Sequence, residues 1–320
     1  MYSRKILFGL AQAHSEEEFY FYYRSHRLLR SLREALPRNA HRRLLRGTPR
    51  ADIFHALNQR VDHKARRTVT TFHDLFVMTG EYSTPDFRAR FTTQAREAAE
   101  RSDRIIAVSQ FTADQVNTLL GVERSRIHVV PHGVDSFDVT RVPREKMVLF
   151  VGAIQTRKNV ARLVRAFERM PREWTLVLAG AADGFGADRQ LAAVTASARS
   201  ADIRVAGYVS REELDALYAR ASIFAFPSLD EGFGMPVLEA MARGVAVVTS
   251  NCSAMPEVAG DAALLVDPHD EDAIAAALVR LAADEGLRSE MVQRGHARVQ
   301  QFTWDRAVRE TWDVYAELRR

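Results

Sequence analysis

The sequence contains one cysteine and no long apolar run, and each absence narrows what the protein can be. Cys252 cannot form an internal disulfide, and no metal-ligand spacing or partnered thiol surrounds it. No apolar run approaches the ~20 residues that span a bilayer, and the N-terminus lacks the apolar segment of a secretory signal. We therefore expect a cytoplasmic protein whose thiol is buried or merely tolerated.

A dinucleotide-binding fingerprint is missing as well. No G-x-G-x-x-G follows an early strand, and Gly180, Gly184 and Gly186 have neither that spacing nor an acidic residue placed for a ribose. A nicotinamide-dependent dehydrogenase is therefore disfavoured. The 320 residues, 47% of them apolar, are enough to bury an ample core, and this length suits two ordinary domains.

Charge is divided unevenly along the chain. Residues 1–134 hold 22 Lys and Arg against 14 Asp and Glu, so the net charge of +4 conceals a basic first part and an acidic remainder. Two interpretations of the densest basic stretch stay open: a surface that attracts the phosphates of anionic lipid, or a solvated helical face. Nucleic acid is the weaker partner, because no nucleic-acid-binding motif accompanies the charge. The stretch contains Arg24, Arg27, Arg30, Arg33, Arg38, Arg42, Arg43, Arg46 and Arg50.

Short apolar runs rich in β-branched residues alternate with helical patterns, which is typical of α/β architecture with parallel sheets. We expect two doubly wound domains that face a cleft, with ligands at the carboxyl ends of the strands. A polar stretch with Pro143 separates two series of strands, so we place a linker at 135–145 between an N-terminal domain, 1–134, and a C-terminal domain, 146–303. The expected strands cover residues 19–23, 52–57, 68–72, 105–108 and 127–130, then 147–151, 175–178, 203–205, 223–226, 245–249 and 262–266.

The chemistry is concentrated in residues 231–239, directly after the expected strand 223–226. Pro236 suits the first turn of a helix and Gly244 suits its end, so we expect a short helix between them, with its N-terminus facing the cleft. Gly232 and Gly234 allow backbone amides to approach a ligand, and the helix dipole favours an anion such as a diphosphate.

Two carboxylates flank this predicted anion site. Glu231 precedes the helix, and the side chain of Glu239 tilts back toward the helix N-terminus. Carboxylates accept paired hydrogen bonds from vicinal hydroxyls, so one glutamate can hold a ribose and the other a transferred sugar. The alternative is that Glu239 only complements the helix dipole and that Glu231 is a loop carboxylate.

An ordered set of motifs resembles glycosyltransferase family 4, the retaining enzymes of GT-B fold. The segment from Glu231 to Glu239 resembles the E-x7-E motif of that family, and further matches occur at the family's separations. The likeness extends from near residue 1 to Tyr315, and it implies a nucleotide-sugar-dependent glycosyltransferase. The further matching segments are 71–75, 108–112, 131–135, 151–159, 207–209 and 256–260.

The resemblance implies roles for the charged residues. Lys158 resembles the lysine that binds the donor diphosphate and stabilises charge on the leaving group. Many members carry an arginine five positions earlier, but Ala153 stands there, so Arg157 is the candidate substitute unless it is a surface arginine. Glu231 resembles the glutamate that contacts the donor sugar, and Glu239 resembles the one that binds the ribose.

The remaining donor-binding residues implied by the resemblance lie in three places. Tyr208 and Val209 occupy the position where the family holds the nucleobase, although Tyr208 equally suits packing. His73 resembles the histidine that reaches the donor sugar from the N-terminal domain, although a lone histidine after a strand is more often structural. The loop residues that approach the donor are Gly152, Gly232, Phe233, Gly234 and Met235.

The resemblance also implies retention of anomeric configuration by front-face attack, with no metal ion and with Glu231 orienting the sugar. Residues 155–159 resemble those of mannosyltransferases in surface-polysaccharide assembly, which favours GDP-mannose as donor and a glycan or lipid-linked acceptor. The acidic run at 267–272 looks like a metal site, but its position at a helix start favours capping. The arginines favour a peripheral position at the inner face of a membrane.

Both ends of the chain carry specific expectations. Residues 2–13 have apolar positions at helical spacing and resemble the family's first helix, in which case the first strand and its glycine-rich turn are missing ahead of Met1. The alternative is a buried strand over residues 5–10. Residues 302–306 resemble the start of the family's last helix, which we expect to cover about 304–320 and to pack back on the N-terminal domain.

Three functions therefore compete. The leading one is a metal-independent hexosyltransferase. The second is a non-catalytic or impaired nucleotide-sugar-binding protein that lacks part of its N-terminal domain. The third is another GT-B activity such as sugar-nucleotide epimerisation. Turnover with a nucleotide sugar and an acceptor separates the first from the other two.

Overall fold

The computed structural model of the chain describes residues 2–62, 65–137 and 142–319. These form two compact units, each drawn from separate stretches of sequence. Unit 1 comprises the described residues of 1–78, 85–133 and 302–320, and unit 2 comprises those of 79–84 and 134–301. A short segment from the first half of the chain, 79–84, thus belongs to the second unit.

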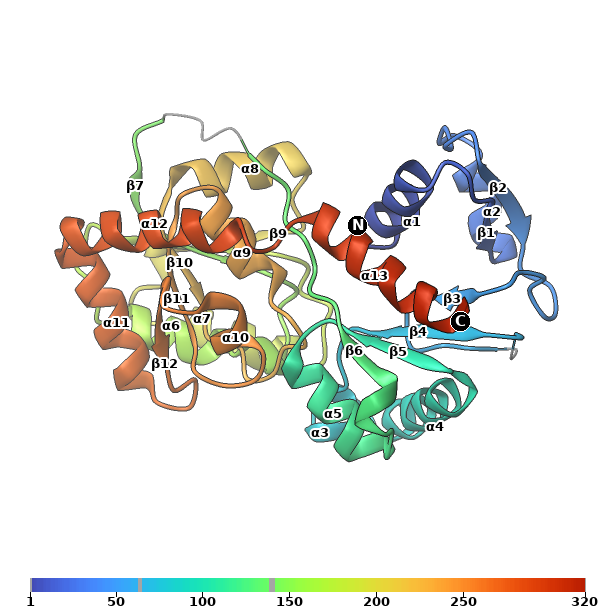
Figure 1. The fold of residues 1–320 in the computed structure, drawn as a ribbon. Helices are drawn as coiled ribbons and strands as arrows, with labels where there is room; N and C mark the ends of the chain where they lie inside the picture. Colours follow the sequence, from blue (N-terminus) through green and yellow to red (C-terminus); the bar gives the residue numbers. More distant parts are fainter. Residues whose placement is uncertain (1, 63–64, 138–141, 320) are drawn as a thin grey trace. The chain divides into compact units, whose positions relative to one another are not determined.

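Unit 2 is built on a six-stranded parallel sheet with the strand order β12-β11-β10-β7-β8-β9 (Figure 1). Its strands are mostly apolar runs, because a parallel sheet between helices is buried on both faces. The order reverses between β7 and β10, which are hydrogen-bonded neighbours although β8 and β9 lie between them in sequence. The strands are β7 Glu145–Val151, β8 Thr175–Ala179, β9 Ile203–Gly207, β10 Ala221–Phe226, β11 Ala246–Ser250 and β12 Ala263–Val266.

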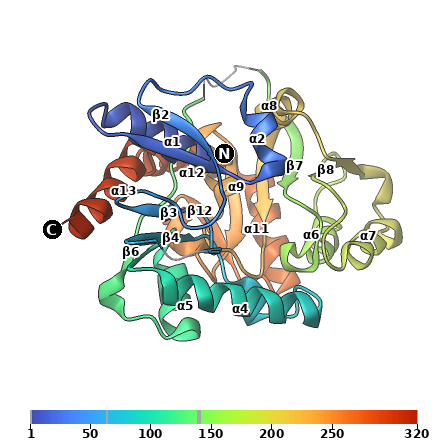
Figure 2. The same cartoon turned by 90° about the vertical axis from the view of Figure 1, so that its right-hand side faces the viewer.

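Helices connect these strands and pack in two groups. One group packs α6 against α7 and α11 (Figure 2), and the other packs α9 against α10 and α12. Right-handed crossovers place helices on opposite faces of a sheet when the strand order reverses, which accounts for the two groups. The helices are α6 Val160–Phe167, α7 Ala187–Ala196, α8 Arg211–Arg220, α9 Met235–Ala242, α10 Met255–Ala259, α11 Glu271–Ala283 and α12 Glu285–Val299, with short 3-10 turns η2 Thr156–Lys158 and η3 Ser200–Asp202.

Unit 1 contains a four-stranded parallel sheet in the order β3-β4-β5-β6, and its two faces contribute to different cores. Ile105 packs with residues of α4 and α5, whereas the next residue, Ile106, packs with residues of α1 and α13. Successive strand residues point to opposite faces, so one short strand serves both cores. The elements are β3 Phe54–Ala56, β4 Thr68–Phe72, β5 Arg104–Ala107, β6 Ile127–Val129, α3 Phe76–Thr79, α4 Pro85–Arg101, α5 Gln110–Leu120 and η1 Arg124–Arg126, with Thr79, the last residue of α3, already in unit 2.

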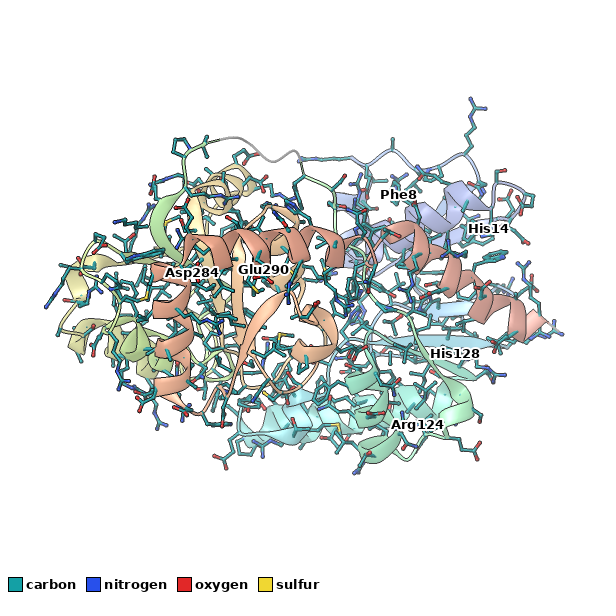
Figure 3. The ribbon with its side chains drawn as sticks, turned by 60° about the vertical axis from the view of Figure 1, so that its left-hand side comes forward. Phe8, His14, Arg124, His128, Asp284 and Glu290 are labelled. Carbon is teal, nitrogen blue, oxygen red and sulfur yellow. The ribbon has the colours of Figure 1, made fainter. Side chains whose placement is uncertain are left out.

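The first and last helices of the described chain lie against each other on this sheet. Residues Tyr2–Ala13 form α1 and bury Ile6 and Leu10, so the predicted helix is confirmed and the alternative strand at 5–10 is wrong. Helix α13, Trp304–Arg319, buries Val308 and Tyr315 in the same core. His14, which follows α1, stacks on Trp312 of α13 with ring centroids 3.6 Å apart (Figure 3).

A separate two-stranded parallel sheet in unit 1 contains the basic stretch. It pairs β1, Phe19–Tyr23, with β2, Ala40–Leu44, and α2, Ser25–Ser31, connects them. The interpretation of the stretch as one helical face is wrong, because its arginines are divided among helix, loop and a strand that the sequence did not predict. The arginines with exposed side chains are Arg27, Arg33, Arg38, Arg43, Arg46 and Arg50.

Two arginines of the stretch have structural partners instead. Arg24 Nη2 lies 2.8 Å from Asp62 Oδ2. Arg42 Nη2 donates to Ser31 O at 2.9 Å and also to Glu34 O, which satisfies carbonyl groups after α2. None of the helices formed by the described residues has the length and apolar character required to span a bilayer.

Candidate functional site

The loops that follow β7 and β10 meet where the strand order of unit 2 reverses. In open α/β sheets this reversal leaves a crevice at the carboxyl ends of the strands, where ligands bind. The loop after β7 covers residues 152–159 and the loop after β10 covers 227–234. Leu229 N donates to Arg157 O at 2.8 Å, and this bond joins the two loops directly.

Three charged side chains are buried together between these loops. Lys158 Nζ lies 2.5 Å from Glu231 Oε1, Arg157 Nη1 lies 2.8 Å from Glu231 Oε2, and each side chain is at most 10% exposed. Ser228 Oγ donates to Glu231 Oε1 at 2.6 Å, and Lys158 Nζ stands 4.5 Å from the centroid of the Phe226 ring. The glutamate is therefore fixed by three donors.

The charges of Lys158 and Arg157 determine the protonation state of Glu231. Burial alone raises the pKa of Glu231, but the charges of Lys158 and Arg157 and the hydrogen bonds from Lys158 and Ser228 outweigh it and lower the pKa to about 2. Glu231 is thus ionised at neutral pH, and with both cations protonated the cluster carries one net positive charge. A buried site of this sign suits a polyanion such as a diphosphate.

Close backbone packing holds the loop that carries the two cations. A Cβ on Gly180 would lie 2.0 Å from Gly152 O, and a Cβ on Gly186, where φ is +74°, would lie 2.2 Å from Thr156 Oγ1. Thr156 N also donates to Phe185 O at 2.9 Å. The glycines that lack a dinucleotide-binding spacing therefore serve to brace this loop.

Asn159 fixes the distance between the two loops. Its φ of +60° lies in the left-handed region, which asparagine tolerates better than most residues. Its side-chain amide donates to Pro227 O at 3.0 Å and to Pro268 O at 2.7 Å. Because Pro227 opens the loop after β10, Asn159 holds Lys158 close to Glu231.

Helix α9 begins beside this cluster. Gly234 precedes it with φ +99°, and a Cβ there would lie 2.2 Å from Met255 Cε. Pro236 occupies the first turn, and Gly244 follows the helix with φ +70°, so both predicted helix boundaries are confirmed. The N-terminus of a helix favours anions, and it extends the positive site of Lys158 and Arg157.

Glu239 lies within α9 and contacts α8. Tyr218 donates its hydroxyl to Glu239 Oε2 at 3.4 Å. Burial raises the pKa of Glu239, and the charges of Arg243 and Arg211 offset part of that effect. Glu239 is therefore more than a charge facing the helix dipole, because its carboxyl has a partner on a neighbouring helix.

Sequence reasoning missed two residues that line this part of unit 2. Thr79 Oγ1 donates to Asp230 Oδ2 at 2.8 Å, which places segment 79–84 against the loop after β10. Burial raises the pKa of Asp230, in the direction opposite to that of the adjacent Glu231. Asp230 could have been found from the sequence, because it is a carboxylate next to Glu231. No local pattern points to Thr79.

Two families match the chain over its two parts. Residues 134–298 match the family described as glycosyl transferases group 1, and residues 9–136 match glycosyltransferase family 4. The first match alone covers more than half of the chain. The chain belongs to the group 1 glycosyltransferases.

Similar proteins agree with this family. The chain is 34% identical to O-antigen chain mannosyltransferase B of Escherichia coli over 83% of this chain and 74% of that protein. It is 29% identical to the serotype-specific mannosyltransferase WbdA of Escherichia coli over 76% of this chain, but it spans only 32% of WbdA. A sucrose-phosphate synthase from Thermosynechococcus elongatus matches with a TM-score of 0.71 and 23% identity, covering 83% of this chain and 73% of that chain.

The structural likeness supports the predicted architecture of two parallel-sheet α/β domains of the GT-B type. In this glycosyltransferase the structure brings three of the predicted catalytic residues together, namely Arg157, Lys158 and Glu231. The alternative of a surface arginine is wrong for Arg157, whose side chain is 9% exposed. The catalytic roles of the three residues stay predictions.

The predicted donor-binding residues differ in exposure. Gly232, Phe233 and Gly234 are buried in the loop before α9, and Gly152 and Met235 are partly buried. Tyr208 is 87% exposed, so the packing alternative is wrong for this residue. The exposed ring of Tyr208, directly after β9, is available to a nucleobase, and Val209 is partly buried. Contact of either residue with the nucleobase stays a prediction.

The fourth predicted catalytic residue, His73, lies in unit 1 with both ring nitrogens engaged. Its Nε2 donates to Leu57 O at 2.9 Å, and its Nδ1 lies 3.3 Å from His132 Nε2. Tyr2 packs against both imidazoles, with ring centroids 4.7 and 4.6 Å away. Contact of His73 with a donor sugar stays a prediction, and it requires one of these hydrogen bonds to be exchanged.

Within the acidic run at 267–272, Asp270 caps a helix, as predicted. Asp270 Oδ1 accepts hydrogen bonds from Asp272 N at 2.9 Å and Ala273 N at 3.0 Å, at the start of α11. Asp267 Oδ1 accepts from His269 N at 2.8 Å. These carboxylates are used for the backbone, in the same way that Asp284 caps α12 (Figure 3).

Proposed function

We propose that this glycosyltransferase moves a hexose from a nucleotide-sugar donor to a glycan or lipid-linked acceptor with retention of anomeric configuration. The observation that carries the proposal is the burial of Arg157 and Lys158 against Glu231 at the reversal of the unit 2 sheet. Two fixed cations next to a helix N-terminus favour a diphosphate, and the carboxylate accepts hydroxyls of the attached sugar.

The mechanism uses the same cluster. When the donor binds, its diphosphate replaces or shares Glu231 as the partner of Lys158 and Arg157, and Glu231 turns to the sugar hydroxyls. The cations then stabilise the charge that develops on the leaving diphosphate, because they already contact it in the bound state. In this proposal the leaving phosphate accepts the acceptor proton, Glu231 orients the sugar, and the two cations supply the positive charge.

Mannose is the favoured sugar and surface polysaccharide the favoured product. The support comes from the names of the similar proteins, two of which are mannosyltransferases and one of which is named for the O-antigen chain. We propose GDP-mannose as donor on this basis. The alternatives are an impaired nucleotide-sugar-binding protein and another GT-B activity such as epimerisation.

The proposal includes peripheral contact with anionic membrane through unit 1. The support is the group of exposed arginines around α2 together with Leu29 and Leu32, which are 76% and 61% exposed. Basic side chains beside exposed leucines suit a surface that carries negative charge outside an apolar layer.

The proposed function is tested by titrating the purified chain with GDP-mannose, UDP-glucose and UDP-N-acetylglucosamine and by following transfer to membrane-derived acceptors. We expect GDP-mannose to bind most tightly and to be consumed only when acceptor is present. Glu239→Ala should weaken binding by about tenfold or more, since a hydrogen bond to a charged group contributes roughly 1.5 to 3 kcal/mol. Glu231→Ala should reduce turnover more than affinity.

Each alternative predicts a different outcome of that experiment. Binding without turnover in any acceptor mixture would favour the impaired binding protein. Conversion of the free donor to another nucleotide sugar would favour epimerisation. Equal affinity for all three donors would remove the basis for mannose, and no binding to any of them would overturn the proposal as a whole.

A further inference from the structure

Arg243 is enclosed by three segments of unit 2. Its guanidinium carbon lies 3.4 Å from the centroid of the Phe137 ring and 4.6 Å from that of Tyr218, so two aromatic rings contact it. Its Nη2 lies 2.5 Å from Asp215 Oδ1, and its side chain is 7% exposed. Rings and a carboxylate together hold a planar guanidinium in one orientation.

Arg243 directly follows α9, and Glu239 lies four residues earlier, within that helix. Arg243 Nη1 donates to Glu239 O at 3.1 Å. Tyr218, which covers the guanidinium, also donates its hydroxyl to the Glu239 carboxyl. Arg144 Nη2 donates to Arg243 O at 2.6 Å, so the end of α9 is held from outside the helix as well.

We propose that Arg243 is a positioning residue for donor binding: clamped by Phe137, Tyr218 and Asp215, it fixes the end of α9 and places a positive charge beside Glu239. The Glu239 carboxylate can then accept two vicinal hydroxyls of the donor ribose. Arg243 itself does not touch the donor. The inference rests on the proposed function, because it takes Glu239 as a donor-binding residue.

The charge of Arg243 matters because Glu239 is largely buried. Burial raises the pKa of Glu239, and Arg243 is the strongest opposing charge. Several elements pack against α9, which carries Glu239. Strands β10 and β11 contain no ionisable side chain, whereas α10 carries Glu257 and α12 brings His296 close to Gly244. Loss of Arg243 would therefore raise this pKa further and leave the carboxyl protonated at a higher pH. The other ionisable groups that act on Glu239 are Arg211, Tyr218 and Asp215.

The test compares Arg243→Met, which removes the charge and keeps the length of the side chain, with Arg243→Lys, which keeps the charge. Calorimetric titration with GDP-mannose is repeated between about pH 5 and about pH 8, the range in which a raised carboxyl pKa is detected. The diphosphate of this probe is esterified at both ends, so it does not itself titrate in that range.

We expect the affinity of the unsubstituted enzyme to fall as the pH drops through the raised pKa of Glu239. In Arg243→Met this fall begins at a higher pH, so the whole affinity profile shifts toward alkaline pH and binding near neutrality is weaker than in the unsubstituted enzyme, because a higher carboxyl pKa leaves more of Glu239 protonated at a given pH. Arg243→Lys stays close to the unsubstituted profile. Glu239→Gln binds at every pH with the weak affinity that the unsubstituted enzyme shows at low pH, and so loses the dependence.

Steady-state kinetics distinguish a role of Arg243 in donor binding from a purely structural one. At alkaline pH, Arg243→Met should keep its kcat at saturating donor, and at neutral pH only its KM for the donor should rise. If this variant does not fold, Phe137→Leu loosens one side of the clamp and should shift the profile in the same direction by a smaller amount.

The outcomes separate this inference from the proposed function. Weaker binding of Arg243→Met by the same factor at every pH would overturn the positioning role and leave the glycosyltransferase proposal intact. An unchanged profile in both Arg243→Met and Phe137→Leu would do the same. Failure of the unsubstituted chain to bind GDP-mannose or UDP-glucose at any pH would overturn both.

Discussion

Unit 2 buries charge, whereas unit 1 buries imidazoles that are held neutral. In unit 2, Glu231 is ionised because two cations outweigh its burial. In unit 1, burial, with a smaller effect from the neighbouring His73, lowers the pKa of His55 to about 3. His55 instead bonds to neutral hydroxyls, with Nδ1 2.6 Å from Tyr315 Oη and Nε2 2.8 Å from Thr71 Oγ1. Burial alone therefore does not set protonation, because the charge of the neighbours decides it.

The contrast has a consequence for acid stability that differs between the two units. Both groups have a lower pKa in the folded state, so both stabilise the fold above their unfolded pKa and lose that contribution as the pH falls. For the histidine the loss begins below its ordinary value of 6.5, and for Glu231 only below its ordinary value of 4.5. Between these values only unit 1 should weaken.

The largest effect is expected from Glu231→Gln, which removes the one negative charge of the unit 2 cluster. Breaking a buried ion pair from one side costs about 3 kcal/mol or more, because Lys158 and Arg157 are left without compensation. We expect unit 2 to unfold at a lower urea concentration and sugar transfer to fall by about 100-fold or more. Urea denaturation and donor turnover measure the two effects.

A nucleoside diphosphate sharpens this experiment. GDP should stabilise Glu231→Gln more than it stabilises the unsubstituted chain, because its phosphates supply the negative charge that the substitution removes. Glu212→Gln, at an exposed carboxylate at the start of α8, is the matched control and should change neither stability nor turnover. Equal stabilisation of both proteins by GDP would show that the cations do not bind the diphosphate.

An intermediate effect is expected from mild acid on unit 1. With a folded pKa of about 3 and an ordinary value of 6.5, His55 should contribute a loss of about 2 kcal/mol on going from neutral pH to pH 5. Amide hydrogen exchange at the two pH values should therefore show the β3–β6 sheet weakening before the β7–β12 sheet.

Substitution distinguishes His55 from other histidines. His55→Gln, which cannot become charged, should be less stable at neutral pH but should lose less stability on acidification. His269→Gln, at an exposed position in unit 2, should behave like the unsubstituted chain. Simultaneous weakening of both sheets at pH 5 would contradict the assignment of the acid effect to the buried imidazole.

The smallest effect is expected from reversing basic charges on the surface of unit 1. Arg27→Glu combined with Arg33→Glu should reduce sedimentation with anionic vesicles at low salt by about tenfold or more, since each basic residue near the surface contributes on the order of 1 kcal/mol. Arg172→Glu combined with Arg204→Glu in unit 2 is the control of equal charge. Equal loss in both pairs would mean that only net charge matters and that α2 has no special role.

Strands and motifs were the predictable part of this structure, since both are local in sequence. The apolar runs at 68–72 and 175–178 recur as β4 and β8, and the segment from Glu231 to Glu239 lies where the sequence placed it, after a strand and into a helix. Strand β2 was missed because its middle residues, His41, Arg42 and Arg43, are charged or polar and give no apolar run. Its stability comes from pairing with the aromatic β1.

The partners of the site residues were not predictable from local pattern. Phe137, Asp215 and Tyr218 meet at Arg243 only because the strand order brings α8 and α9 together. The same holds for Thr79, which meets Asp230 across 151 residues of sequence. Sequence reasoning finds residues with unusual chemistry, whereas the contacts that tune them depend on the fold.

Helix α13 has a consequence for the order in which the chain folds during synthesis. Residues of α13, among them Val308 and Tyr315, complete a core whose remaining residues come from the first half of the chain, and Tyr315 bonds to His55 across 260 residues. The 134–301 part of unit 2 emerges from the ribosome as one continuous stretch, ahead of α13. The later-synthesised domain should therefore mature first, while the earlier one waits with an open hydrophobic face that a chaperone can bind until the last helix emerges.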